Sequence, residues 1–200
     1  MHRVFISYHH DNDQPYKEKL VEIAERNSIF VDMSVDTGDI TEDLDDEHIR
    51  KIIRDNYLRD STVTIVLVGT DTKHRKHVDW EIHSSMYDGV VNKRSGILVI
   101  NLPTIPDSSC QAAYGEEEKK LIHPEITTWT SVDAREEYER LYPHMPDRII
   151  DNLIKPKVTI SVVPWYKINA STLRFLIDMT FQNRSNCKYD LSRKMKRANR

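Results

Sequence analysis

The chain has 200 residues, of which 38% are hydrophobic and 30% are charged, a balance typical of a globular protein and not of a disordered one. Its five glycines are too few for a collagen-like or glycine-rich architecture, and a net charge of −3 gives it no general attraction to nucleic acid. No window holds the roughly 18 apolar residues of a membrane span, and the N-terminus has no signal-peptide core. Because Cys110 and Cys187 form no disulfide or metal pattern, we expect a cytoplasmic protein with no membrane partner.

The charge is unevenly distributed along the chain. Residues 184–200 contain seven Lys and Arg and a single acid, Asp190, which leaves a balance of −9 for the other 183 residues. An acidic body is a poor nucleic-acid binder, because neutralising phosphates requires a basic face. We therefore predict one domain over residues 1–183, followed by a short, solvated basic tail over 184–200, and no nucleic-acid partner.

The start of the chain alternates strand and helix patterns. Residues 3–8 (RVFISY) are almost continuously apolar and predict a buried strand. After a polar loop, Asp13 is a credible helix N-cap with Pro15 in the first turn, and apolar residues at helical spacing continue to about Asn27. Residues 29–31 predict a short second strand.

The stretch over residues 32–47 is a polar loop with eight acidic residues, Asp36 among them, and one glycine, Gly38. A calcium-binding loop needs acids at alternate positions, a central glycine and a closing glutamate, and this stretch does not fit that pattern. The adjacent His9 and His10 would point in opposite directions in a strand. We therefore predict no metal site.

The middle of the chain contains its strongest periodic patterns. Residues 48–59 predict a helix, and residues 62–68 (TVTIVLV) and 96–101 (GILVIN) predict buried strands. Between these two strands, a basic turn leads into a helix that we expect to begin near Val78 and to end near Asn92. That helix has an apolar residue at every fourth position: Val78, Ile82, Met86 and Val90.

After Pro103 the pattern weakens, and residues 103–157 are interpreted as an irregular excursion within the domain. The elements expected in it and after it are a possible strand at 127–132, short helices at 134–141 and 146–153, a last strand at 158–163 and a closing helix at 171–181. The overall alternation of strands and helices predicts a flavodoxin-like α/β fold, with a doubly wound, mostly parallel sheet and helices on both faces.

In such a fold the functional loops follow the strands at their carboxyl ends. Phe5, Tyr8, His9 and Glu81 can therefore converge at one edge of the sheet, although they are far apart in sequence. Glu81 lies near the start of its helix, just outside the apolar stripe. A carboxylate there either serves a ligand or simply complements the helix dipole, and spacing alone leaves both interpretations open.

Several familiar motifs do not occur in the sequence. It contains no GxGxxG, GxxxxGK[ST], GxSxG or HExxH, which excludes the common nucleotide-binding, serine-hydrolase and zinc-protease signatures. A receiver-type phosphorylation site needs an acidic pair directly after the first strand and an aspartate that closes the third. Asp11, Asp13 and Asp71 are displaced from those positions by several residues, so a receiver-like signalling module is a weak alternative.

Three motifs resemble those of a known family. The sequences VFISYHHDND at 4–13, STVTIVLVGTDT at 61–72 and RKHVDWEI at 75–82 are similar to those of the TIR-like proteins of the Thoeris anti-phage defence system. The resemblance covers the first half of the chain. Family members often have a tryptophan just before the valine of the third motif. This chain has His77 there, which puts the shape of the pocket around Glu81 in doubt.

The resemblance implies a TIR fold and an NAD-consuming activity in which Glu81 is the catalytic residue. Breaking the nicotinamide–ribose bond generates an oxocarbenium-like cation, which a fixed carboxylate stabilises as in glycoside hydrolases. Nicotinamide leaves as a neutral group, so we expect no cofactor or metal, with NAD as the substrate. We expect the substrate to be bound by Phe5, Ser7, Tyr8, His9, Asp36 and Trp80. For Phe5 the competing interpretation is core packing, and for Trp80 it is packing against a neighbouring loop or subunit.

The function that the resemblance implies is that of an NAD glycohydrolase or cyclic ADP-ribose isomer synthase. Its diffusible product would activate a separate effector during phage infection, and exclusion of water from the site would favour a cyclic product. The resemblance also implies a phage-derived trigger and self-association through TIR surfaces. A rival from another class of protein is a non-enzymatic TIR adaptor, which works only by homotypic association.

Overall fold

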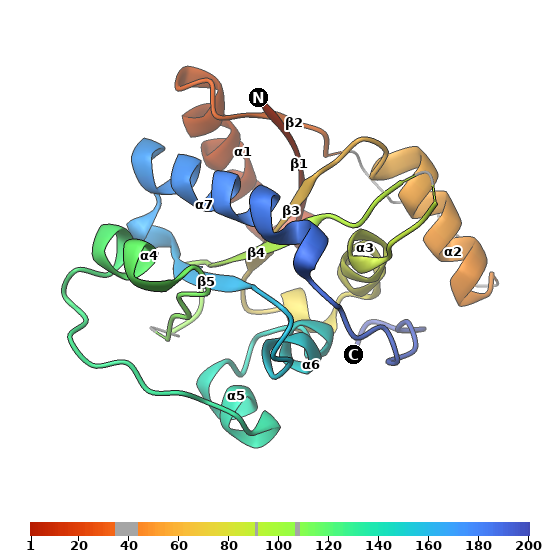
Figure 1. Ribbon diagram of the computed structural model, residues 1–200. Coiled ribbons are helices and arrows are strands. Elements are labelled where there is room, and N and C mark those ends of the chain that lie inside the picture. The colour runs from red at the N-terminus through yellow and green to blue at the C-terminus, as the bar shows by residue number, and fades with distance from the viewer. Residues whose placement is uncertain (35–43, 91, 107–108) are drawn as a thin grey trace.

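The computed structural model describes residues 1–34, 44–90, 92–106 and 109–200. Its centre is a five-stranded sheet in which every neighbouring pair of strands is parallel, in the order β2-β1-β3-β4-β5 (Figure 1). The strands are β1 (His2–Ser7), β2 (Phe30–Asp32), β3 (Val63–Val68), β4 (Gly96–Asn101) and β5 (Ser161–Pro164). This is the strand order of flavodoxin-like doubly wound sheets, so the predicted fold class is confirmed.

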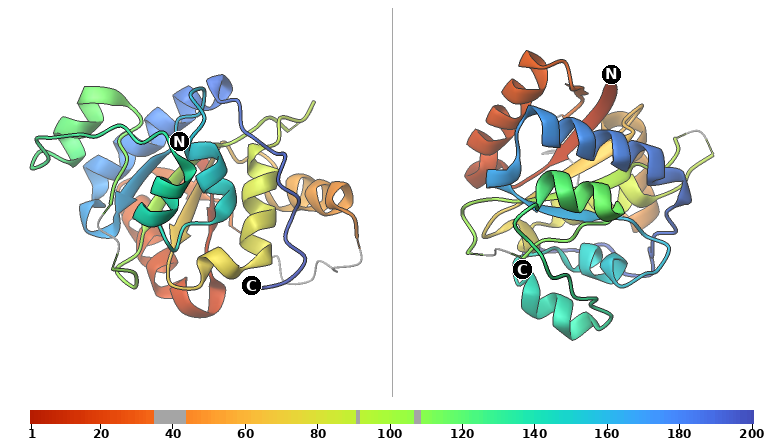
Figure 2. Two further views of the ribbon diagram at one scale, coloured as in Figure 1. Left: turned by 90° about the horizontal axis from the view of Figure 1, so that it is seen from below. Right: turned by 60° about the vertical axis from the view of Figure 1, so that its left-hand side comes forward.

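Helices cover both faces of this sheet, as Figures 1 and 2 show. One face packs against α1 (His10–Arg26) and α7 (Ala170–Asn183), with α4 (Gly115–Ile122) beside them. The other face packs against α3 (Lys76–Met86), α5 (Arg135–Leu141) and α6 (Asp147–Leu153). Next to α3 lie α2 (Asp46–Ile52) and the π-helical turn that continues it, Ile53–Tyr57. The described residues also form 3-10 turns at Thr72–His74, Trp165–Lys167 and Arg184–Asn186.

The central strands form because their residues are apolar on both sides. All six residues of β3 and all six of β4 are buried, and β-branched side chains suit a sheet that is covered on both faces. In the ladder, Val63 lies opposite Val4 of β1 on one side and opposite Gly96 of β4 on the other. This register brings the carboxyl ends of β1 and β3 together in the middle of the sheet.

The start of α1 differs from the sequence-based prediction. The helix begins at His10 with His9 as its N-cap residue, so the prediction that Asp13 is the N-cap was wrong. Asp13 instead lies inside the helix and is 1% exposed. Its carboxylate lies against Gly69, a tertiary contact that the local sequence does not reveal.

The end of α3 also differs from the prediction. The helix ends at Met86, because Tyr87 has an extended backbone conformation, and the prediction that it continues to Asn92 was wrong. The amide of Gly89 donates a hydrogen bond of 3.1 Å to the Asn92 carbonyl and so closes a loop there. Val90, which was predicted to complete the apolar stripe, is 93% exposed.

The excursion after Pro103 is more regular than predicted, since it contains α4. Three glutamates occupy the first turn of α4 and two lysines its last turn, the arrangement that the helix dipole favours. The possible strand at 127–132 is wrong, because those residues form no regular structure. Gln111 makes an isolated antiparallel bridge to Val162 of β5 instead. The helices predicted at 134–141 and 146–153 are confirmed as α5 and α6.

Gly96 begins β4 directly beneath α7. A Cβ atom at this position would overlap the backbone carbonyl oxygen of Thr180, which the helix holds in place. We expect Gly96→Ala to push α7 away from the sheet and to lower the free energy of unfolding by about 1–3 kcal/mol, the usual effect of overpacking. Urea unfolding of the two proteins measures this difference. Equal stability would show that the helix shifts without cost.

Burial of Glu118 in α4 makes the free energy of unfolding depend on pH. Its side chain is fully buried and accepts a hydrogen bond of 2.7 Å from the Tyr114 amide, and burial raises its pKa from an ordinary 4.5 to about 7. The folded state therefore retains a proton that the unfolded chain releases. Below pH 4.5 the buried neutral carboxyl makes its full contribution to the free energy of unfolding. This contribution is lost as the pH rises to about 7.

Glu118→Gln removes this titration, because the amide stays neutral. Relative to the variant, we expect the wild type to lose roughly 2–3 kcal/mol of unfolding free energy between pH 4.5 and 8. Urea unfolding at several pH values measures both profiles. Parallel profiles would contradict the raised pKa.

Residues 187–200, which we call the strap, lie against the body of the protein. Cys187 is 1% and Met195 3% exposed. Basic side chains of the strap pair with acids of the body, Arg193 with Asp151 and Arg197 with Asp46. The prediction that the basic tail is solvated was therefore wrong, because the acidic body attracts it and an apolar residue anchors it. The predicted domain boundary at residue 183 stays a prediction.

Candidate functional site

The carboxyl edge of the sheet has one position at which the chain leaves neighbouring strands in opposite directions. β1 and β3 are neighbours, yet β2 lies outside β1 on one side and β4 lies outside β3 on the other. In doubly wound sheets the loops that leave two such strands separate, and ligands bind in the crevice between them. The candidate site residues are therefore those that gather beyond Ser7 and Val68, the last residues of the two strands.

Glu81 reaches this position from α3. The apolar stripe of Val78, Ile82 and Met86 packs on the sheet, and Glu81 lies beside it, facing β1. The Ser7 hydroxyl donates a hydrogen bond of 2.6 Å to Oε2 of Glu81, and the two side chains are 0% and 2% exposed. Since hydrogen bonds are directional, this contact fixes the Glu81 carboxyl group at the end of β1.

Phe5 and Trp80 lie on the same side of the sheet as the Glu81–Ser7 pair. They pack together in an apolar cluster with Ile49, Ile53, Leu58 and Met195. Phe5 is 1% and Trp80 0% exposed, so both rings support the site from within the core. Their predicted contact with substrate stays a prediction. Their buried positions agree with the alternative interpretation, in which both rings serve packing.

Tyr8 lies on the opposite face of the sheet from Glu81. Its ring belongs to the core cluster under α1 and α7 and stacks on His10 at 4.4 Å between ring centroids. Its hydroxyl donates a hydrogen bond to Gln14 of α1. The period of two along β1 places Phe5 and Ser7 on one side of the sheet and Val4 and Ile6 on the other. Tyr8, which directly follows the strand, packs on the side of Ile6.

A second polar group lies where α1 meets the loop after β3. Asp13 is buried there, and burial raises the pKa of its carboxyl. The Thr72 hydroxyl accepts a hydrogen bond of 2.9 Å from the Gly69 amide and lies 3.4 Å from Oδ2 of Asp13. His9 is 6% exposed, and neither its Nδ1 nor Asp13 Oδ1 has a hydrogen-bond partner within the described part of the chain.

Of this second group, sequence reasoning selected only His9. Asp13 and Thr72 were missed, because the role of Asp13 depends on its contact with a loop 59 residues away. The one local sign was Gly69, directly after the strand β3. A glycine at such a position can allow another side chain, here that of Asp13, to approach closely.

The last predicted site residue, Asp36, lies outside the described residues. A cavity with a volume of about 600 Å³ lies within the excursion, and its lining includes Cys110, Trp129 and Tyr138. Glu81 is not among the residues that line this cavity. The candidate site is therefore defined by the Glu81–Ser7 pair at the edge of the sheet.

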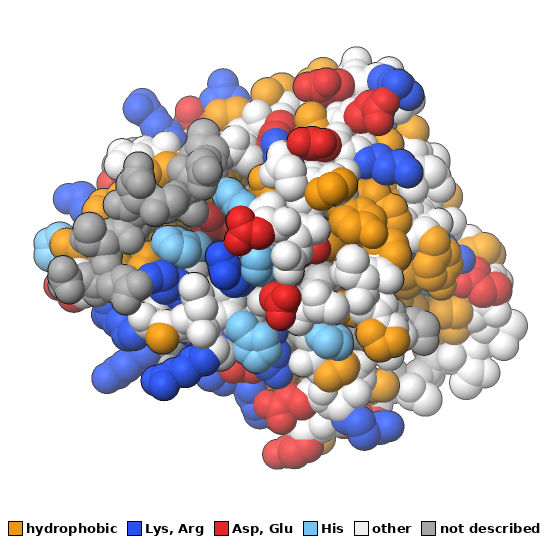
Figure 3. Space-filling view, turned by 180° about the vertical axis from the view of Figure 1, so that it is seen from behind, with side chains coloured by type: hydrophobic (Ala, Val, Ile, Leu, Met, Phe, Trp, Pro, Cys, Tyr) orange, Lys and Arg blue, Asp and Glu red, His pale blue; other side chains and the backbone are white. Residues whose placement is uncertain are grey.

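Histidine and acidic side chains gather on the face of the molecule seen from behind (Figure 3). Within residues 1–34, 44–90, 92–106 and 109–200, no group of three or more His, Cys, Asp or Glu side chains is arranged to hold a metal ion. In the same residues, no helix has both the length and the apolar character needed to cross a membrane.

Comparisons with known proteins give one match. Residues 5–107 match the family described as Thoeris protein ThsB, TIR-like domain. The matched segment begins in β1 and contains the Glu81–Ser7 pair. It ends soon after β4, at the start of the excursion and before α4, α7 and the strap. No curated protein and no solved structure matches the chain.

Proposed function

This chain belongs to the family of the Thoeris protein ThsB, TIR-like domain, whose match spans just over half of its residues, and on that premise we propose that it is an enzyme that cleaves NAD. In the proposed reaction the bond between nicotinamide and ribose breaks, and Glu81 is the catalytic residue. The family match identifies the chain as a TIR-like protein of the Thoeris defence system, and NAD cleavage is the activity that we add to it.

One observation carries the proposal: a buried carboxylate is held by a hydroxyl at the switch point of the sheet. Ser7 orients Glu81 through a hydrogen bond of 2.6 Å. A carboxylate fixed before the reaction pays little reorganisation energy when positive charge develops beside it, and such preorganised electrostatic stabilisation is often the largest single contribution to catalysis. The same side chain suits the ribosyl cation for the reason that glycoside hydrolases use carboxylates.

The proposed cleavage of NAD needs no oxidant or reductant. The carbon–nitrogen bond breaks, its electron pair leaves with nicotinamide, and the ribose carbon becomes an oxocarbenium-like cation opposite Glu81. Water can add to that carbon and lose a proton, which gives ADP-ribose. A nucleophilic atom of the same ADP-ribosyl group can add instead, which gives a cyclic isomer. Exclusion of water favours the second outcome.

Nucleotide mass spectrometry tests this function in cells that carry the complete defence system. Cells expressing the wild type or Glu81→Gln are compared before and after phage challenge. We expect a new ADP-ribose isomer, or ADP-ribose with loss of NAD, in the challenged wild type alone. If neither strain forms a new species although the protein is folded and the phage is blocked, the enzymatic proposal is wrong.

The rest of the biological setting follows from the same proposal. The product diffuses to a separate effector, a phage-derived component triggers its formation, and the protein self-associates through TIR surfaces. NAD is the substrate, and no further cofactor is needed.

A non-enzymatic TIR adaptor is the second candidate function. The observation in its favour is the burial of Glu81, whose 2% exposure leaves little of its side chain open to a ligand. An adaptor would keep its defence activity in Glu81→Gln, because its association surfaces are unchanged. Loss of defence in this variant, with the fold intact, therefore separates the enzyme from the adaptor.

A further inference from the structure

The strap passes directly beside the helix that carries Glu81. In the view from below (Figure 2, left), its trace runs along α3 on the side of α2. The hydrogen bonds agree with this path, because the strap bonds to Asp79 of α3 and to Asp46 of α2. Residues that are more than 100 positions apart in sequence are therefore neighbours at the candidate site.

The strap supplies hydrogen bonds that the first turns of α3 do not obtain locally. The N-cap residue of this helix makes no side-chain capping bond. Instead, Oδ1 of Asn199 accepts a hydrogen bond of 2.9 Å from the Lys76 amide, which is the first amide of α3. An external acceptor at this position stabilises a helix as an N-cap side chain does.

Two more bonds hold the residues immediately before Glu81. The Lys196 amide donates a hydrogen bond of 2.9 Å to Oδ2 of Asp79. The indole Nε1 of Trp80 donates a hydrogen bond of 2.7 Å to the Lys196 carbonyl. Both groups of the Lys196 backbone are thus bonded to side chains one and two residues before the catalytic candidate.

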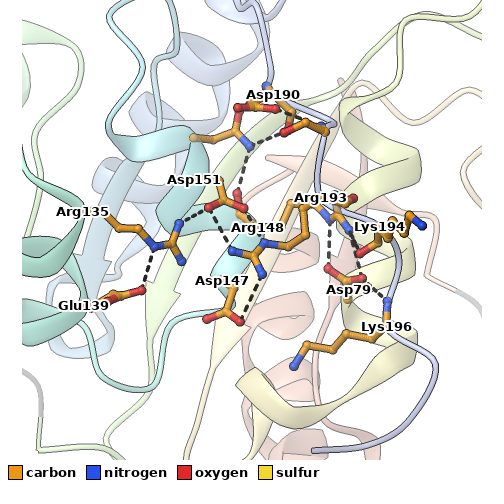
Figure 4. A network of polar contacts seen from close by, with 12 residues as sticks. Asp79, Arg135, Glu139, Asp147, Arg148, Asp151, Asp190, Arg193, Lys194 and Lys196 are labelled. Atoms are coloured by element: carbon orange, nitrogen blue, oxygen red, sulfur yellow. Dashed lines mark hydrogen bonds and ion pairs between the residues drawn. The ribbon is translucent and has the colours of Figure 1, made fainter.

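Arg148 of α6 ties the strap and α3 to the same point (Figure 4). Its guanidinium is fully buried and makes a two-pronged ion pair with Asp79, at 2.9 and 3.1 Å. The same group donates hydrogen bonds to the carbonyls of Arg193 and Lys194 in the strap. Met195 then places its side chain in the apolar cluster that contains Phe5 and Trp80.

We infer that the strap is a positioning element of the proposed NAD site. By fixing the first turns of α3, it holds Glu81 in hydrogen-bonding register with Ser7 at the end of β1. This inference rests on the proposed function, because it assigns the strap a role in NAD cleavage. A displacement of about 1 Å in a catalytic group can lower turnover on the order of 100-fold, so a strap that holds the helix can control the rate.

Met195→Lys in the full chain tests the inference, because a charged side chain cannot remain in the apolar cluster. Ala198→Lys is the matched control: it adds the same charge to the strap at an exposed residue outside the bonds described above. Asn199→Ala is a milder variant that removes only the cap on Lys76. Far-UV circular dichroism and thermal unfolding establish that each protein is folded.

Two measurements are made on these proteins: hydrogen exchange of peptides covering residues 76–82, and steady-state NAD cleavage. For Met195→Lys we expect at least about tenfold faster exchange in these peptides, the change that corresponds to loss of one hydrogen bond. We also expect kcat to fall on the order of 10–100-fold with little change in KM. Asn199→Ala should show smaller changes in the same direction, and Ala198→Lys should match the wild type.

The possible outcomes separate the two proposals. Unchanged exchange in Met195→Lys overturns the positioning role whatever the activity. Faster exchange with unchanged or increased turnover also overturns it, since the helix would then be free and Glu81 still competent. A wild type that cleaves no NAD even when an extract of phage-challenged cells supplies the trigger overturns the proposed function, and the catalytic role of the strap falls with it. Faster exchange together with the kcat loss supports both.

Discussion

Glu81→Gln is expected to lower the rate of NAD cleavage about 100- to 1,000-fold and to leave the fold intact. Glutamine has nearly the same shape, and its carbonyl oxygen can still accept the hydrogen bond that Ser7 donates to Oε2 of Glu81. What the substitution removes is the negative charge. The size of the loss follows from the usual effect of deleting one preorganised electrostatic contact to a charged transition state.

The measurement is single-turnover cleavage of NAD by the purified protein at a concentration that permits self-association. An extract of phage-challenged cells that lack this protein supplies the trigger, and nicotinamide release is followed by chromatography. Ser7→Ala is the companion variant, because it keeps the charge and removes only the bond that orients it. We expect a loss for Ser7→Ala that is clearly smaller than for Glu81→Gln. A Glu81→Gln protein as active as the wild type would exclude Glu81 as the catalytic residue.

The sequence predicted the sheet well because each strand carries its own signal. The runs at 62–68 and 96–101 are apolar and β-branched throughout, and such runs are buried strands in most parallel sheets. Alternation with helices then restricts the strand order to few topologies. The carboxyl-edge rule led us to expect Glu81 near Phe5, Tyr8 and His9, but its hydrogen bond with Ser7 was not predicted.

The residues that surround Glu81 were harder to predict, because their contacts are long-range. Tyr8 follows Ser7 directly, yet it faces the other side of the sheet. The two-residue period of a strand predicts this separation once the boundary of β1 is known. By contrast, no local pattern connects Lys196 with Trp80, because the hydrogen bond between them spans 116 residues.

The basic composition of residues 184–200 was misleading for a related reason. Charge runs are usually solvated, but the acidic body provides partners such as Asp46 and Asp151. Tyr189, Leu191 and Met195 were the local signs of docking, since they are large apolar residues within a charged segment. The strap lies beyond the segment that matches the family, which ends at residue 107. The helix that carries Glu81 is thus held partly by a segment outside the match.

The ion pair of Asp79 and Arg148 yields the largest expected effect on stability. Arg148 is 0% and Asp79 3% exposed, so replacing Arg148 by methionine leaves a buried carboxylate without its cation. Breaking a buried pair in this way costs about 3–5 kcal/mol of unfolding free energy. The remaining bond from the Lys196 amide to Asp79 compensates only in part, because it carries no full positive charge.

Urea unfolding of Arg148→Met, Asp79→Leu and the double variant measures the coupling between the two residues. We expect the double variant to be more stable than Arg148→Met alone, because an apolar pair removes the buried charge and much of its desolvation cost. The double variant still lacks the acceptor for the Lys196 amide, so it should not regain the full wild-type stability. A loss below about 1 kcal/mol in Arg148→Met, the level typical of an exposed pair, would show that water reaches Asp79. The strap would then be far looser than its contacts with Arg148 imply.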